Sequence, residues 1–452
     1  MRSGPSVLAL LLFLMTEVLT HDLTAEQPAA LNIGSRLELL VDHYLIDRMK
    51  NTELQLHRPQ LSTSVNQPFC NYATVIKDGD IYRMYYRRGT SAYDGDPRET
   101  YCYAESRDGI HWTRPSLRLF EVNGTRDNNV FLANTSWFAH NFTPFLDSRS
   151  GVSREQRFKA LAGVHKGGGL FAFVSGDGIH WKKLRDEPVI TSSDFAFDSQ
   201  NVSFWSESEG CYVCYFRTWK TPQGRLRTIS RTTSRDFVNW SEAAPMNPNA
   251  AGEHLYTNGT HPYFRTPHLY VALPTRFLPN RGNSTDIMFM TSRGGNRYDR
   301  TFMEAFIRPG LDPERWGNRA NYAALNVVPT APAELSIYVR DLRYVLRTDG
   351  FASLNAPYTG GEMVTKPLQF TGEELVINFA TSAAGGIRVE IQRSDGEPIP
   401  GYNLSDCHQI IGDRIERIVR WESGSDVSEL AGQPIRLRFV MKDADLYSLR
   451  FR

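Results

Sequence analysis

The sequence has few cysteines and no excess of charge of either sign. Five cysteines are an odd number, so at least one stays free or pairs with another molecule, and the chain is no disulfide-stabilised scaffold. Lys and Arg total 51 against 50 Asp and Glu. This balance gives no general attraction to nucleic acid or to membrane lipid, so we expect neither as a partner.

Long hydrophobic runs are missing apart from one near the start of the chain. Val7 to Met15 has the length of a signal-peptide core and is too short to span a bilayer. We expect residues 1–20 to be a signal peptide and the protein to be secreted or periplasmic. The cleavage point is not evident, so an uncleaved N-terminal anchor stays open.

Motifs for nucleotides, zinc and nucleophilic serine are also absent. The sequence holds no P-loop, dinucleotide fingerprint, zinc-protease helix or nucleophile elbow. Cys211 and Cys214 lie in an alternating strand pattern that turns them to opposite faces, which argues against a shared metal or a redox pair. We expect no cofactor, with a calcium ion in a central channel as an open alternative.

What the sequence does contain is a repeated turn: a strand ending in Ser, an Asp or Gly, and an aromatic residue. Asp caps the turn, Gly takes the positive φ, and the aromatic side chain packs between sheets, so these residues are structural. The copies recur every 55 to 69 residues, which suits a four-stranded propeller blade. They begin at Ser106, Ser175, Ser234 and Ser292, with a degenerate fifth at Arg347 to Phe351.

Five copies predict an all-β fold with a five-bladed β-propeller over residues 31–350. The fifth blade is short, so it lacks a strand or takes one from Leu37 to Ile46. After Phe351, short alternating strands between Gly-rich turns predict a β-sandwich over residues 351–452. A weak helical pattern occurs near Leu311 to Trp316.

Candidate binding residues come from the antiparallel arrangement within each blade. The start of an innermost strand lies on the same face as the end of the next strand. The inner-strand starts and nearby segments supply Tyr72, His140, Asn141, Gln200, Asn201 and His261. The ends of the following strands supply Arg87, Arg88, Arg217, Arg276 and Arg340.

Two interpretations of these arginines stay open. They are surface residues at strand edges, or they form a ring of guanidinium groups at the channel mouth. Such a ring favours a carboxylated or sulfated sugar, because guanidinium binds these groups through charge-assisted hydrogen bonds.

Candidate catalytic residues are the inner-face carboxylates, since glycosidic cleavage uses two carboxylic groups with different pKa values. The candidates are Asp198, Glu253, Glu304 and Glu334. Each has a competing structural role as a buried hydrogen-bond acceptor. We expect at least two of them to approach each other across the channel mouth.

Residues 31–350 resemble the five-bladed propeller of glycoside hydrolase families 32 and 43. The resemblance lies in Lys77 to Tyr86 and in the turns ending at Trp112 and Trp181, and the C-terminal part is similar to the sandwich of family 32. It implies an Asp nucleophile or base, a second Asp that positions substrate and a Glu acid. Tyr72 stands where the family has its first-blade Asp, so the triad does not carry over.

Three functions therefore stay open: a glycosidase, which we favour, a noncatalytic glycan-binding propeller, and another propeller enzyme such as a sialidase-like hydrolase or a lyase. A carbohydrate is the expected partner in each case. The sugar, the linkage, the stereochemical outcome and the oligomeric state are left open by the sequence.

Overall fold

The protein is built almost entirely from β-strands. The computed structural model describes residues 30–69, 71–88, 99–133 and 136–452. In this part of the chain the helices are short 3-10 turns and none is an α-helix: Ser136–Ala139, Arg154–Gln156, His165–Gly167, Pro313–Trp316 and Ser428–Leu430. The prediction of an all-β chain is confirmed. The predicted signal peptide at 1–20 lies outside the described residues.

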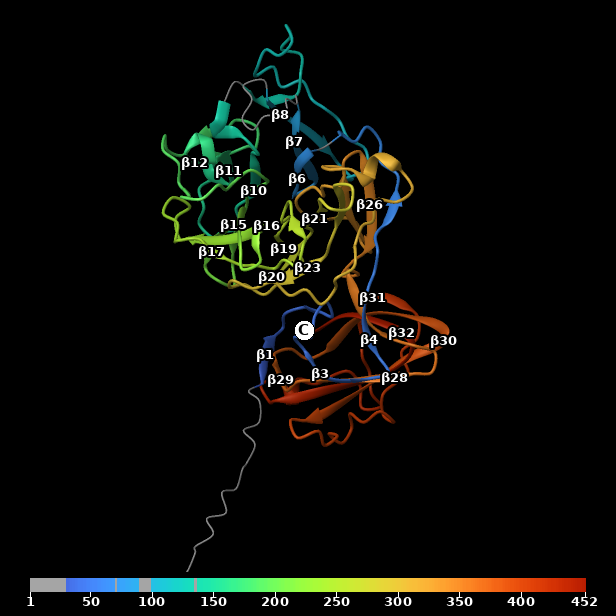
Figure 1. Cartoon of the computed structure of the whole chain (residues 1–452). Coiled ribbons are helices and arrows are strands. Elements are labelled where there is room, and N and C mark those ends of the chain that lie inside the picture. Colours follow the sequence, from blue (N-terminus) through green and yellow to red (C-terminus); the bar gives the residue numbers. More distant parts are fainter. Residues whose placement is uncertain (1–29, 70, 89–98, 134–135) are drawn as a thin grey trace, which may run out of the picture.

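Small antiparallel sheets follow one another along residues 71–347, and Figure 1 shows them arranged around a common centre. The first sheet contains β6 (Asn71–Asp78), β7 (Ile81–Arg88), β8 (Thr100–Ser106) and β9 (Val130–Leu132). The second contains β10 (Thr143–Leu146), β11 (Phe158–Val164), β12 (Gly169–Ser175) and β13 (Lys182–Lys183). The third contains β14 (Val202–Ser206), β15 (Cys211–Thr221), β16 (Gly224–Ser234) and β17 (Ala244–Pro245).

The fourth sheet is split, and the fifth is completed by a strand from the N-terminal segment. The split sheet has β19 (His261–Tyr263), β20 (Thr266–Ala272) and β23 (Met290–Ser292), next to β18 (His254–Leu255), β21 (Thr275–Leu278) and β22 (Ser284–Ile287). The fifth has β24 (Val328–Ala331), β25 (Glu334–Val339), β26 (Leu342–Arg347) and β5 (Gln60–Ser62). A strand is thus contributed by the N-terminal segment, but by Gln60–Ser62 rather than by Leu37 to Ile46.

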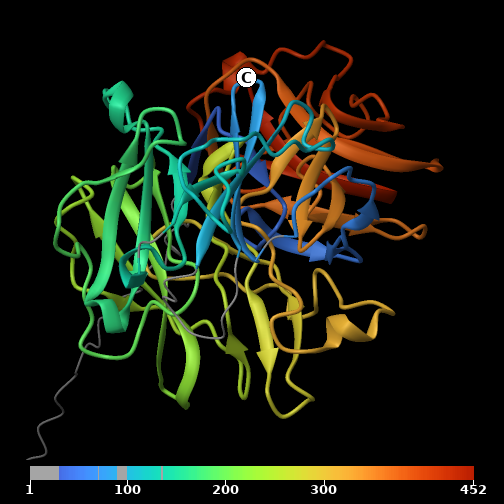
Figure 2. The same cartoon turned by 90° about the horizontal axis from the view of Figure 1, so that it is seen from above.

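The C-terminal part forms a separate ten-stranded sheet, which Figures 1 and 2 show in red against the other sheets. Its own strands are β27 (Ala352–Ala356), β28 (Gly361–Thr365), β29 (Leu368–Phe370), β30 (Leu375–Arg393), β31 (Asp413–Ile418) and β32 (Ile435–Phe451). Four strands from the N-terminal segment join it: β1 (Leu31–Gly34), β2 (Glu38–Leu39), β3 (Ile46–Lys50) and β4 (Glu53–Leu56). Residues 31–56 therefore pair with the C-terminal sheet, although the predicted first domain begins at residue 31.

The repeated turns have the local chemistry that the sequence predicts. In the first turn the backbone N–H groups of Ile110 and His111 each donate to Asp108 Oδ1 at 2.8 Å, and Gly109 N donates to Ser106 Oγ at 2.8 Å. The turns at Asp177 and Asp236 repeat these bonds. These carboxylates are therefore used to hold the turns.

The aromatic residues that close the turns join neighbouring sheets. Trp112 of the first sheet packs edge-on against Tyr338 of the fifth, with ring centroids 5.5 Å apart. Trp181 of the second sheet packs in the same way against Tyr85 of the first, at 6.4 Å. Burial of these rings stabilises the contact between successive sheets, because large aromatic side chains remove much apolar surface from water.

The four described cysteines, Cys102, Cys211, Cys214 and Cys407, are free thiols. Among the described residues no helix is long and apolar enough to cross a membrane.

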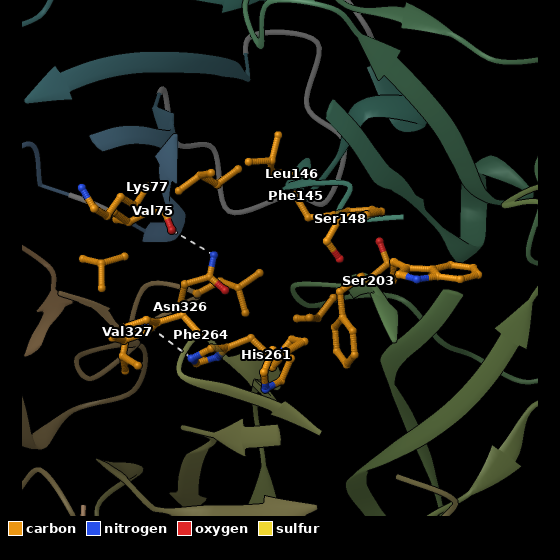
Figure 3. Close-up of a pocket in the computed structure, with 18 of the residues that line it drawn as sticks. Val75, Lys77, Phe145, Leu146, Ser148, Ser203, His261, Phe264, Asn326 and Val327 are labelled. Carbon is orange, nitrogen blue, oxygen red and sulfur yellow. Dashed lines mark hydrogen bonds between the residues drawn. The ribbon is translucent and has the colours of Figure 1, made fainter. Parts of the chain in front are cut away.

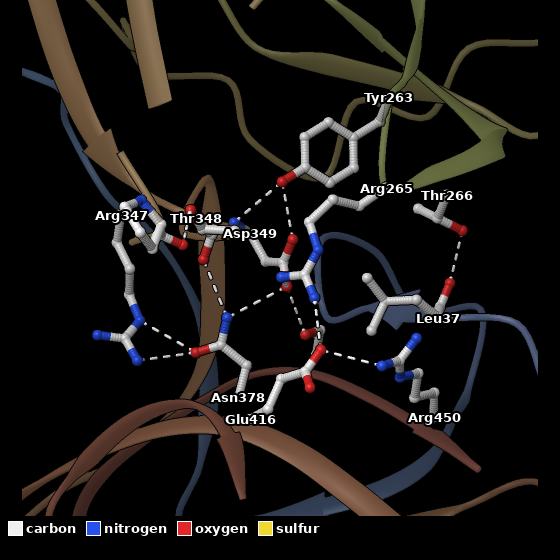
Figure 4. Close-up of polar contacts among 12 residues, drawn as sticks. Leu37, Tyr263, Arg265, Thr266, Arg347, Thr348, Asp349, Asn378, Glu416 and Arg450 are labelled. Atoms are coloured by element: carbon white, nitrogen blue, oxygen red, sulfur yellow. Dashed lines mark hydrogen bonds and ion pairs between the residues drawn. The ribbon is translucent and has the colours of Figure 1, made fainter. Parts of the chain in front are cut away.

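A buried carboxylate holds the C-terminal sheet against the fourth sheet, as Figure 4 shows. Asp349, in the degenerate fifth repeat, has no exposed surface. It accepts hydrogen bonds from Tyr263 Oη at 2.7 Å and Arg265 Nη1 at 2.9 Å on one side. On the other side it accepts from Ser448 Oγ at 2.8 Å and Asn378 Nδ2 at 3.2 Å.

Candidate functional site

The two ends of the innermost strands differ in their side chains. At the ends where β6, β10, β14 and β19 finish lies a cavity of about 600 Å³ with a mainly apolar lining. Figure 3 shows this cavity, with Val75 and Phe145 among the residues that line it. At the opposite ends, where these strands start, arginine, tyrosine and carboxylate side chains gather.

We call this second group the central cluster, and its members come from the first, third and fourth sheets and a connecting segment. It consists of Tyr72, Arg87, Asp198, Arg217, Arg227, Tyr256, Arg319 and Tyr322. The rings of Tyr72 and Tyr256 each lie next to that of Tyr322, with centroids 5.1 and 5.3 Å apart. The three rings are almost fully buried, so they hold the strand starts together from the inside.

The backbone at Tyr72 is unusual. Its φ is 48°, a left-handed value that costs an aromatic residue free energy of order 1–3 kcal/mol. The β6–β7 register shifts at the same point, between Asn71 and Thr74. The surrounding packing therefore holds Tyr72 in place against this strain, as is typical of ligand sites.

Guanidinium groups cover the faces of these rings. Arg87 Cζ lies 4.7 Å from the Tyr72 ring centroid, and Arg217 Cζ lies 5.1 Å from that of Tyr256. Arg227 Cζ lies 4.7 Å from the centroid of the Tyr256 ring and 4.3 Å from that of the Trp219 ring. Cations over aromatic faces are stabilised by the ring quadrupole, more so when water is excluded.

Two carboxylates belong to this region, and they differ in how many partners they have. Glu99 accepts from Arg87 Nη1 at 2.9 Å and contacts His140 Nδ1 at 2.8 Å, so both of its oxygens are occupied. Asp198 Oδ2 accepts from Arg217 Nη2. The Asp198 side chain is 25% exposed, so this carboxylate can be reached by water.

Positive charge dominates the cluster and changes the pKa values of its neighbours. Burial raises the pKa of Tyr256, but the charges of Arg217 and Arg319 together lower it by more than burial raises it. The pKa of Tyr256 therefore lies below the ordinary value of a tyrosine. Burial instead raises the pKa of Tyr72 to about 12. Burial, followed by the charges of Arg227 and Arg217, lowers the pKa of His254, whose Nδ1 accepts from the Arg227 backbone N–H at 3.1 Å.

Six of the predicted site residues meet in or beside the central cluster. They are Tyr72, Arg87, His140, Asn141, Asp198 and Arg217, with Arg87 Nη1 donating to Asn141 Oδ1 at 2.9 Å.

Two further predicted binding residues lie nearby but bond to the backbone. Gln200 Nε2 donates to the carbonyl of Ala73 at 2.9 Å, which joins the third sheet to the first. Asn201 Nδ2 donates to the carbonyls of Phe197 and Ser199. Both side chains are buried and fix the strand starts.

Other predicted binding residues have different surroundings. Arg276 forms an ion pair with Asp286 at 2.6 Å, so it does not take part in the arginine ring that the sequence predicts. Arg340 lies over the ring of Phe69, with its Cζ 4.8 Å from the centroid. Arg88 is exposed at the end of β7. Of the predicted arginine ring, Arg87 and Arg217 thus belong to the central cluster.

His261, the first residue of β19, faces the apolar cavity rather than the central cluster. It lines the apolar cavity, and its ring joins two backbone segments (Figure 3). Nδ1 lies 3.0 Å from the carbonyl of Gly259, and Nε2 accepts from the backbone N–H of Val327 at 3.1 Å. Because these bonds require a neutral ring with hydrogen on Nδ1, His261 is structural.

The other three predicted catalytic carboxylates do not share the contacts of Asp198. Glu253 is buried in an ion pair with Arg300. Glu334 pairs with Arg343 in the fifth sheet. Glu304 is exposed on the segment between β23 and β24. The structure therefore brings one of the four, Asp198, to the central cluster.

Sequence reasoning missed Glu99, Arg227, Arg319 and Tyr322. Glu99 and Arg227 lie at the start of the third strand of their sheets, β8 and β16. In an antiparallel sheet the start of the third strand lies on the same face as the start of the first strand and the end of the second. The same reasoning that selected residues at those two positions could therefore have selected Glu99 and Arg227. Arg319 and Tyr322 lie on a connecting segment without a periodic signal.

The described residues contain no group of three or more His, Cys, Asp or Glu side chains that could hold a metal ion.

Comparisons with known proteins give distant matches. No family model matches the sequence. An uncharacterized protein of Mycobacterium tuberculosis, Rv1502, is 27% identical over 150 residues, which is 32% of this chain. The match spans 45% of that relative's length.

Solved structures similar to this chain include glycoside hydrolases, as the sequence resemblance predicted. A family 43 arabinoxylan arabinofuranohydrolase from Bacillus subtilis has a TM-score of 0.41 at 13% identity, and the match covers 86% of this chain and 96% of that one. A fructofuranosidase from Schwanniomyces occidentalis has a TM-score of 0.41 at 12% identity, covering 87% and 97%. A thermostable family 43 glycoside hydrolase has a TM-score of 0.44 at 13% identity, covering 66% and 96%.

Proposed function

We propose that the chain is a secreted glycoside hydrolase that cleaves a poly- or oligosaccharide, preferably an anionic one, at the central cluster. Its fold, in this proposal, is a five-bladed β-propeller followed by a β-sandwich. The observation that supports it is the meeting of Asp198 with Arg217 and with a tyrosine of lowered pKa at the starts of the innermost strands.

Hydrolysis of a glycosidic bond needs one group that accepts a proton and one that donates a proton. Asp198 is the base in this proposal, because Arg217 orients it and water reaches it. Tyr256 is the acid, since Arg217 and Arg319 lower its pKa below that of the neighbouring tyrosines.

Water oxygen bonds to the anomeric carbon while Asp198 takes its proton, the bond from this carbon to the leaving oxygen breaks, and Tyr256 gives its proton to that oxygen. A water attacking opposite the leaving group inverts the configuration, so inversion is the expected outcome.

Partly exposed aromatic side chains beside the cluster supply a surface for a sugar ring. Trp219 lies next to Arg227 and His254, and Phe195 lies 6.4 Å from the Trp219 ring and is 37% exposed. Aromatic faces with a polar tip suit contacts to the C–H groups of a sugar ring.

A noncatalytic glycan-binding module is the second candidate. It is favoured because, among the residues that the structure describes, no carboxylate pair is available at the central cluster: Glu253, Glu304 and Glu334 lie elsewhere, and Glu99 has both oxygens occupied. In that case the same side chains bind glycan without cleaving it.

The test is release of reducing sugar from a panel of neutral, uronic and sulfated polysaccharides. The enzyme proposal predicts release from at least one of them, with the opposite anomer as the first product by NMR. Binding to a polysaccharide of the panel without any release would replace the hydrolase by the binding module. Retention of the anomeric configuration would remove Asp198 as base to a water.

A further inference from the structure

The central cluster holds more positive charge than its carboxylates balance. Arg87 pairs with Glu99 at 2.9 Å, and Arg217 pairs with Asp198. Among the described residues, Arg227 and Arg319 have no carboxylate partner within ion-pair distance. Within the part of the chain that the structure describes, the cluster thus carries two guanidinium groups more than its carboxylates balance.

Arg227 has the least compensated charge of the four. Its guanidinium lies between aromatic rings, with Cζ 4.3 Å from the centroid of Trp219 and 5.2 Å from that of Phe277. Its Nη1 approaches the Nδ1 of His254 at 3.4 Å, and its Nε has no hydrogen-bond partner among the residues with described positions. Burial and then repulsion from Arg217 lower the pKa of Arg227.

Arg217 and Asn141 also have hydrogen-bond donors without partners. The Arg217 side chain is 3% exposed, and its Nη2 donates to Asp198, while Nε and Nη1 donate to no atom of the described residues. Asn141 is 1% exposed, and its Nδ2 likewise has no partner in the described ranges of the chain. Buried donors without acceptors are costly, so their persistence points to an acceptor supplied by a ligand.

We propose that Arg227, with Arg217 and Arg319, forms an anion subsite for the acidic group of a sugar residue, a carboxylate or a sulfate. The sugar ring lies against Trp219, and the acidic oxygens accept from the guanidinium groups. The inference rests on the proposed function only in taking the ligand to be a glycan. It names the class of that glycan and the residues that select it.

The test measures binding rather than cleavage. The Asp198→Asn variant is titrated by calorimetry with three oligosaccharides of equal length: oligogalacturonate, its carboxyl-reduced neutral form, and a sulfated galactan fragment. At least tenfold tighter binding of one acidic oligosaccharide than of the neutral form is expected, and which of them binds decides between carboxylate and sulfate. A higher salt concentration should weaken this preference, because exposed charges are screened.

Substitutions at Arg227 test whether this arginine causes the preference for the acidic oligosaccharide. Arg227→Gln should reduce the preference for the acidic sugar about tenfold or more, while Arg227→Lys should retain part of it, because the charge is kept. Arg276→Gln is the matched control, because it removes an arginine that pairs with Asp286 and is not a member of the central cluster. This variant should bind like the parent protein. Circular dichroism confirms that each variant is folded.

The outcomes separate this inference from the proposed function. Equal binding of acidic and neutral forms, no binding of any of the three, or an unchanged preference in Arg227→Gln overturns the anion subsite, even if the protein hydrolyses other glycans. Selective binding of an acidic form by a protein that cleaves nothing supports the subsite and overturns the hydrolase.

Discussion

The junction at Asp349 and the central cluster are built from the same kinds of side chain. They differ in saturation, that is, in whether every buried hydrogen-bonding group has a partner. In the junction, a buried carboxylate accepts from an arginine, a tyrosine, an asparagine and a serine, which leaves it fully bonded (Figure 4). In the central cluster, Arg217 and Arg227 retain donors without acceptors. A saturated network stabilises the fold, whereas surplus donors leave free energy available to a ligand.

The largest expected effect is at the saturated junction. Asp349→Ala leaves the buried Tyr263 and Ser448 and the partly buried Arg265 without this acceptor, so the free energy of unfolding should fall by about 3–5 kcal/mol. Urea denaturation measures it. The control is Asp413→Ala, which removes an exposed partner of Arg347 and should cost less than about 1 kcal/mol. Equal losses in the two variants would remove the distinction between junction and surface.

The central cluster should respond in activity rather than in stability. Asp198→Asn removes the proposed base, so kcat should fall about 10²–10⁴-fold on whichever polysaccharide is cleaved. Asp286→Asn alters the same kind of Arg–Asp pair outside the cluster and should leave kcat unchanged. If Asp198→Asn keeps full activity, Asp198 belongs with the saturated structural carboxylates.

His261 should behave as a saturated group whose stabilising effect depends on pH. Complete burial lowers the pKa of His261 to about 4, because the charged ring would lose its hydration in the interior. Protonation of Nε2 would in addition break its bond from Val327 N–H. The unfolded chain binds this proton from about pH 6.5 downward, so the contribution is complete above pH 6.5 and is lost as the pH falls towards 4. The loss amounts to about 3 kcal/mol.

The measurement is the free energy of unfolding from pH 4 to pH 7, compared between the parent protein and His261→Gln. The variant should be less stable at pH 7 and should show a shallower dependence on pH in this window. Parallel curves would mean that His261 is not held neutral by its two backbone partners.

The smallest expected effect is at an exposed repeat turn. Asp236→Ala removes the acceptor of the backbone N–H groups of Val238 and Asn239, and a loss of about 1 kcal/mol is typical of such capping side chains. The neighbouring Arg235→Ala is exposed and serves as the control, with an expected change within about 0.5 kcal/mol. A loss of activity in Asp236→Ala at unchanged stability would contradict a structural role for the repeats.

The sequence predicted those features that depend on neighbouring residues. The Ser-x-Asp turns, the β-strands between them and the packing of Trp112 and Trp181 between sheets could be derived from turn chemistry and alternation. The starts of the inner strands led to Tyr72, Asn141 and Asp198 in the same way. The sequence could not separate the carboxylate of the central cluster from carboxylates in structural ion pairs, because Glu253 and Glu334 fit the same pattern as Asp198.

What the sequence by itself determined is thus the local β-structure and its repetition, since each turn and strand is set by residues within a few positions of one another. Only the tertiary structure decided which side chains meet: Tyr72 packs against Tyr322 of a distant connecting segment, and Glu99, which pairs with Arg87, also contacts His140 beside the second sheet. The tertiary structure likewise decided that Asp349 is saturated while Arg227 is not. Saturation depends on partners supplied by distant segments, and a local pattern carries no information about them.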